Sequence, residues 1–96
     1  MANPATPQQP QQIQVNTTDE LSRGRFSNNI LIGHSQEEFI LDWMLNSPSG
    51  MHLVSRIVVT PGHMKRIVAA LAENLRRYEQ LFGQVIVPEG TEQKFH

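Results

Sequence analysis

The feature that most constrains the fold is a change of hydrophobic period at Thr60-Pro61. Before this point apolar and polar residues alternate, as they do in β-strands, and after it apolar residues recur every three or four positions. Thr60 suits a helix N-cap because its hydroxyl accepts a free backbone N–H, and Pro61 suits the first helical position. Gly83 suits the C-terminal cap. The sequence therefore predicts one amphipathic helix of about 22 residues, roughly 33 Å long.

Apolar residues form a stripe along the whole predicted helix. The stripe consists of Met64, Ile67, Val68, Leu71, Leu75, Tyr78 and Phe82. Small residues beside it (Ala69, Ala70 and Ala72) would let another helix approach closely, although alanine also favours helix on an exposed face. Either way, the stripe needs a surface to cover it.

Strands are expected at residues 13–15, 25–34, 39–45 and 53–59, from their alternating pattern, with a short extra strand at 85–87. The segments between them are polar, and NSPSG at 46–50 is the clearest loop. Asn28-Asn29 suits a strand poorly and indicates a bulge, an edge strand, or amides offered to a partner backbone. We therefore expect an α+β fold, an antiparallel four-stranded sheet followed by one long C-terminal helix.

Large apolar residues lie on both sides of the predicted sheet. Trp43 shares one side with Phe39, while Ile40 and Met44 share the other. A sheet with one face in water would show a clean hydrophobic and polar alternation instead. Because one helix covers only one side, we expect a symmetric homo-oligomer, joined through helix or sheet.

The chain divides into a disordered Pro/Gln-rich tail at 1–12, a single α+β domain at 13–87 and a flexible C-terminal tail at 88–96. A core of about 65–70 residues lies near the lower limit for stability, and no cysteine is present to reinforce it. The net charge of −1 disfavours a generic nucleic-acid or membrane binder. Without an apolar run of about 18 residues, the expected location is the cytoplasm.

No catalytic signature stands out. His34 and His52 could meet in a sheet and bind a metal with Glu38, but nothing in their spacing requires this. Ser35, His34 and Asp42 supply the residue types of a nucleophilic triad without the GxSxG turn, and no phosphate-binding glycine loop occurs. The sequence therefore predicts no enzyme, no cofactor and no metal.

Basic residues concentrate on the predicted helix. Lys65, Arg66, Arg76 and Arg77 outnumber Glu73 and Glu79 there, which would suit a DNA-associated regulator. However, both glutamates are three residues from Arg76 and could pair with it, and cations near a helix C-terminus also complement the helix dipole. A solvated helix face is the favoured interpretation.

The segments FSNNILIGHSQEEFILDW and SRIVVTPGHMKRIVAALAENLRRYEQLFG resemble a small bacterial family of unknown function. Its pattern runs SNN, HSxEEFxLDF, TPxHxKR and YExxFG, matched here at residues 27–29, 34–42, 60–66 and 78–83, and Trp43 replaces the usual phenylalanine after the aspartate. The resemblance implies no activity, cofactor or catalytic residue. The order of four strands and a long helix is also similar to the export chaperone SecB, whose apolar grooves hold unfolded chains, although fold alone does not imply function.

The predicted function is a non-enzymatic homo-oligomeric interaction module: a scaffold, an adaptor or a polypeptide binder like SecB. The alternative is the DNA-associated regulator. Partners would be other copies of the chain and a further protein or peptide, through surplus apolar surface and open sheet edges. The predicted interaction residues are Ile40, Trp43, Met44, Val58, Ala69, Leu75, Tyr78 and Phe82.

Overall fold

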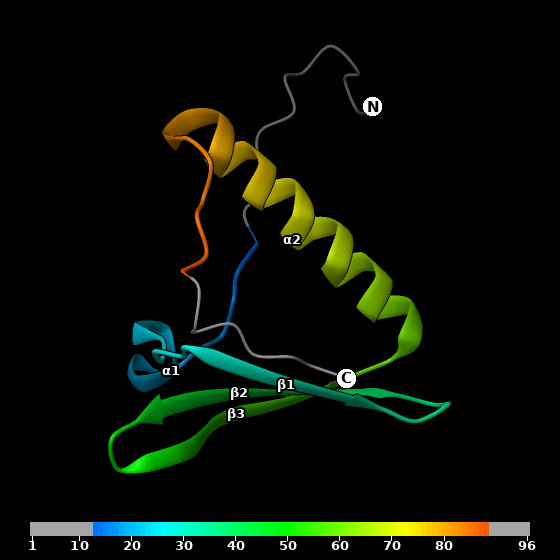
Figure 1. The fold of residues 1–96 in the computed structure, drawn as a ribbon. Helices are drawn as coiled ribbons and strands as arrows, with labels where there is room; N and C mark the ends of the chain where they lie inside the picture. Colours follow the sequence, from blue (N-terminus) through cyan, green and yellow to red (C-terminus); the bar gives the residue numbers. More distant parts are fainter. Residues whose placement is uncertain (1–12, 89–96) are drawn as a thin grey trace, which may run out of the picture.

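The computed structural model describes residues 13–88 and contains two helices and three strands within them (Figure 1). In chain order these are α1 (Asp19–Arg23), β1 (Asn29–His34), β2 (Phe39–Ser47), β3 (Gly50–Val59) and α2 (Pro61–Phe82). The strands form one antiparallel sheet in the order β1-β2-β3. The α+β class and the long helix after the sheet agree with the prediction, but the predicted fourth strand is wrong. The likeness to SecB thereby loses its basis, which was a four-stranded sheet.

The strand expected at 13–15 is absent. Ile13 and Val15 are exposed and belong to no strand, since so short an alternation finds no partner in the sheet. The polar segment after them, expected to be a loop, contains α1 instead. Thr18 caps this helix, its hydroxyl accepting from the Leu21 N–H at 3.2 Å. Residues 83–88 likewise form no strand. The predicted tail at 1–12, and all but residue 88 of the tail predicted at 88–96, lie outside the described residues.

The loop predicted at 46–50 is shorter than expected. Ser47 and Gly50 are paired in the sheet, so only Pro48 and Ser49 form the turn. Gly50 has a φ of 123°, a conformation that glycine alone adopts without strain. The hairpin therefore lengthens both strands, and β3 starts at Gly50 rather than residue 53.

A bulge occurs in β3, not at Asn28-Asn29. Trp43 pairs with Ser55 and Met44 with Leu53, which leaves Val54 as the extra residue. Asn29 opens the edge strand β1, so the edge-strand alternative holds for it. The pleat and register give the sheet two faces. The inner face, toward α2, carries Ile30, Ile32, His34, Phe39, Leu41, Trp43, Leu45, His52, Ser55, Ile57 and Val59. The outer face carries Leu31, Ile40, Asp42, Met44, Met51, Leu53, Arg56 and Val58.

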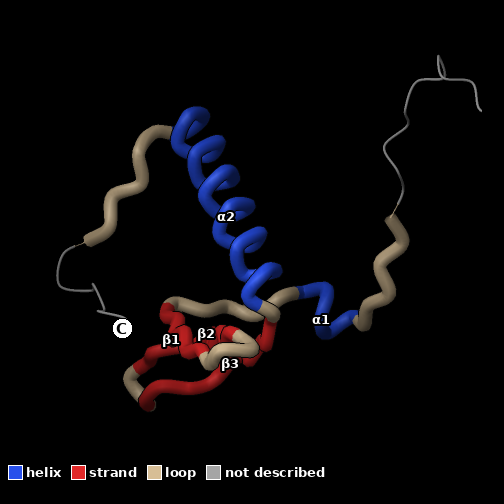
Figure 2. The backbone as a smooth tube through the Cα atoms, turned by 90° about the vertical axis from the view of Figure 1, so that its right-hand side faces the viewer, coloured by secondary structure: helices blue, strands red, loops and turns tan. Residues whose placement is uncertain are grey.

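Helix α2 begins and ends where its sequence predicts. The Thr60 hydroxyl accepts from the His63 N–H at 3.2 Å, and the Gly83 N–H donates to the Glu79 carbonyl with a φ of 95° at the glycine. Only Thr60 separates β3 from α2. A layer packed on a sheet lies about 10 Å from it. Because the connection is a single residue, it leaves little chain to carry the helix across that distance and lay it flat on its own sheet. The helix accordingly rises away from the sheet at an angle (Figures 1 and 2).

The described part of the chain has almost no core. Leu41 and Val59, at 4% and 8% exposure, are its only buried hydrophobic residues, and α2 has no buried residue at all. Both buried side chains lie on the inner face. Within residues 13–88, much of the apolar surface of the sheet and helix is therefore exposed.

Candidate functional site

The exposed apolar surface follows the stripe of α2. Along most of the helix its residues are between 51% and 58% exposed (Val68, Leu71, Leu75 and Tyr78), and Phe82 reaches 72%. Only Met64 and Ile67, near the start, are partly covered. The stripe is thus bare wherever α2 has left its sheet.

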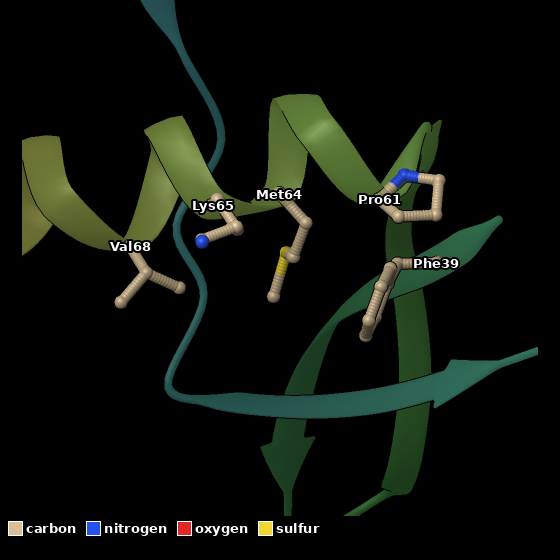
Figure 3. A pocket seen from close by; sticks show the side chains of 5 residues that line it. All are labelled: Phe39, Pro61, Met64, Lys65 and Val68. Carbon is tan, nitrogen blue, oxygen red and sulfur yellow. The ribbon is translucent and has the colours of Figure 1, made fainter.

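A hollow lies where α2 meets the sheet (Figure 3). It has a volume of about 350 Å³ and is lined by Phe39 of β2 and by Pro61, Met64, Lys65 and Val68 of α2. Its walls are apolar apart from the lysine ammonium. It lies at the corner of the wedge between inner face and helix, and it offers space for one or two apolar side chains rather than for a polar reaction.

The structure separates the four sheet residues predicted for interaction. Ile40 and Val58 are directly paired neighbours on the outer face, and Met44 lies further along the same face. Trp43 lies on the inner face, opposite Ser55, and is 36% exposed. The prediction therefore mixed two surfaces.

A cross-strand ion pair divides the outer face. Arg56 donates from Nε and Nη2 to the two carboxylate oxygens of Asp42 at 2.7 and 2.8 Å. These hydrogen bonds hold the pKa of Asp42 below its ordinary value of 3.8. The pair separates Ile40 and Val58 from Met44, so the outer face is mixed in character. The inner face is apolar apart from Ser55 and the histidines at its two ends.

The predicted helix residues lie on exposed parts of α2. Tyr78 and Phe82 form an aromatic pair with ring centroids 4.9 Å apart, one turn from each other at the far end of the helix. Leu75 continues the stripe toward them, and Ala69 is exposed. All four lie beyond the first two turns, the part of α2 that borders the hollow.

Sequence reasoning missed Ile32 and Ile57, which flank Leu41 on the inner face and are 36% and 47% exposed. Both were recognised as strand residues. Their shared face depends on the pairing register, which their own alternation does not fix.

Two of the four basic helix residues are held by one glutamate. Arg76 donates to both carboxylate oxygens of Glu73, at 3.0 and 2.7 Å, and Arg77 donates to one at 3.1 Å. The hydrogen bond from Arg76 is the main reason that the pKa of Glu73 is lowered. Glu79, also expected to pair with Arg76, instead accepts from the Val85 backbone N–H at 2.9 Å. The ion pairs at Glu73 weaken the basic field that DNA binding would need.

His34 and His52, which could have met in a sheet, lie far apart. His34 lies opposite Phe39 and His52 opposite Leu45, so six residues of β2, about 20 Å, separate them along the sheet. His34 contacts the Phe39 ring, and His52 bonds to the Ser49 hydroxyl. Within residues 13–88 no three histidine or acidic side chains cluster as metal ligands would. Asp42, held by Arg56, also forms no triad with Ser35, whose hydroxyl accepts from Glu37.

A model of the family described as "Protein of unknown function (DUF3467)" matches residues 1–86. The chain belongs to this family. The match confirms the predicted resemblance to a family of unknown function, while the residue pattern given for it stays a prediction. No curated protein and no solved structure matched.

The family description assigns no chemistry, and the candidate site consists of the exposed stripe, the inner face and the hollow between them. Among the described helices, neither has the length and apolar character that crossing a membrane requires.

Proposed function

We propose that this DUF3467 chain is a protein-interaction module that associates with copies of itself and reaches its folded state in that assembly. The observation that carries the proposal is the contrast between two buried hydrophobic side chains and a bare apolar stripe along α2. A monomer of this size normally covers most of its apolar residues, and large exposed patches mark interaction surfaces.

The free energy gained by covering the stripe is comparable with the cost of association. Burying a side chain of this kind fully stabilises by about 1.5–3 kcal/mol, so covering the exposed half of each contributes about 1 kcal/mol. Five such residues on each of two copies give about 10 kcal/mol. Association costs an estimated 4–15 kcal/mol, and the inner face adds further apolar area.

Self-association also leaves a surface for a second partner. If the inner face and the stripe are covered in the assembly, Ile40 and Val58 remain as an apolar pair beside the Asp42–Arg56 ion pair on the outer face. Such a mixed patch suits a scaffold or adaptor that holds a protein or peptide. The alternative of a DNA-associated regulator gains no support from the arginines that Glu73 holds.

Light scattering after size-exclusion chromatography tests the proposal directly. The expected result is a molar mass of at least two chains at micromolar concentration. A mass of one chain, in a sample whose circular dichroism shows the folded helix, would refute it.

A further inference from the structure

We infer that two copies join through the outer edges of their β1 strands, so that their sheets form one continuous six-stranded antiparallel sheet. The inference rests on the proposed self-association and specifies its surface. Both sheet edges are open in the described part of the chain, because β1 and β3 each pair with β2 alone. The two edges differ in how they are protected.

Natural edge strands avoid unwanted pairing through charged residues, prolines and bulges. The β3 edge has such protection, since it contains Arg56 and the bulge at Val54. The β1 strand, NILIGH, contains no acidic residue, no lysine, no arginine and no proline, and it has no bulge. At the start of this edge the Ile30 N–H donates to the Asn29 Oδ1 at 2.8 Å. The backbone groups farther along β1 form the edge that is ready to accept another strand.

The path of α2 points to the same edge. The helix starts at the end of β3, and its second turn already borders a hollow with Phe39 of β2. It leans toward β1 as it rises (Figure 2). Strands added beyond β1 would supply further inner-face surface on the side where the bare half of the stripe lies.

Symmetry restricts how two β1 strands can pair. A two-fold axis perpendicular to an antiparallel sheet keeps each residue on its own face, and directly opposite residues share a face. Near the middle of β1 this leaves two registers: Leu31 opposite Leu31 of the partner subunit, or Ile32 opposite Ile32 of the partner subunit. In the first the two Leu31 side chains face each other, and in the second they are diagonal neighbours.

A matched pair of substitutions tests this edge. Leu31 of β1 and Leu53 of β3 both lie on the outer face, on opposite edges, with 48% and 52% exposure. Leu31→Lys brings two like charges together across the proposed junction and should weaken self-association at least about tenfold, whereas Leu53→Lys should leave it within about twofold. Sedimentation equilibrium measures the self-association constants of both variants and of the wild type. Equal effects, or a larger one for Leu53→Lys, would overturn the inference.

A second measurement needs no variant. In dimers mixed from isotope-labelled and unlabelled wild-type chains, isotope-filtered NMR should show Hα–Hα contacts between the β1 strands of different copies. Intermolecular contacts confined to β3 or to α2 would overturn the inference while leaving the proposed self-association intact. A monomer would overturn both.

Discussion

At the scale of single residues, the Asn28 side-chain amide makes the pair of hydrogen bonds that a backbone residue would make in the sheet. Its Nδ2 donates to the Asn46 carbonyl at 3.0 Å, and its Oδ1 accepts from the Asn46 N–H at 2.7 Å. The amide thereby prolongs the β1–β2 ladder beyond the first residue of β1. The alternative of an amide offered to a partner's backbone therefore does not apply to Asn28, whose amide is bonded to the backbone of its own sheet.

Replacing Asn28 by alanine removes both hydrogen bonds. Since each is worth about 0.5–1.5 kcal/mol, we expect Asn28→Ala to lower the free energy of unfolding by about 1–3 kcal/mol. Urea denaturation at one fixed protein concentration measures this. Asn74→Ala is the control, because that exposed amide bonds only to the Ala70 carbonyl of its own helix and alanine is the better helix former. Equal losses from both substitutions would contradict the assignment.

The Asp42–Arg56 pair predicts a pH dependence. The folded-state pKa of Asp42 is lowered, chiefly by hydrogen bonds from Arg56, so its contribution to stability is complete above the unfolded pKa and is lost as pH falls through the folded one. An NMR titration should place the Asp42 midpoint below 3.8, and Arg56→Gln should raise it toward that value. The same midpoint in both proteins would contradict the pairing. Because Arg56 is exposed, the effect on stability should be small.

At the scale of elements, helix α2 could be predicted from sequence because its determinants are local. Thr60, Pro61 and Gly83 mark its ends, and the stripe gives its period, so its bounds agree with the structure. The β-elements depend on pairing instead. Residues 13–15 alternate without acquiring a partner, and the turn at Pro48-Ser49 is shorter than its polar sequence indicates because Gly50 joins the sheet.

The stripe of α2 yields a prediction at the same scale. Leu75→Glu should weaken self-association strongly, since a carboxylate would replace an apolar side chain at a surface that loses its water. Gln80→Glu adds the same charge to the exposed side of α2 away from the stripe and should leave the molar mass unchanged. Light scattering compares the two. If Leu75→Glu retains the mass of the wild type at equal concentration, the stripe is not part of the interface.

At the scale of the whole molecule, the sequence shows a surplus of apolar surface but not where it gathers. Alternation along β2 alone places Trp43 and Ile40 on opposite faces, but only the register shows that Val58 of β3 lies beside Ile40. Likewise His34 and His52 were possible neighbours until the pairing separated them along β2. Such long-range relations follow from register, which an alternating pattern specifies weakly when both faces are apolar.

The account's central claim is that folding and self-association are one process, because two buried hydrophobic side chains cannot stabilise the described chain alone. The most direct test is the dependence of the urea unfolding midpoint, followed by the circular dichroism of the helix, on protein concentration. For a dimer that unfolds to separate chains, raising the concentration about a hundredfold adds about 2.7 kcal/mol of apparent stability and shifts the midpoint upward. A midpoint that does not move with concentration would contradict the claim.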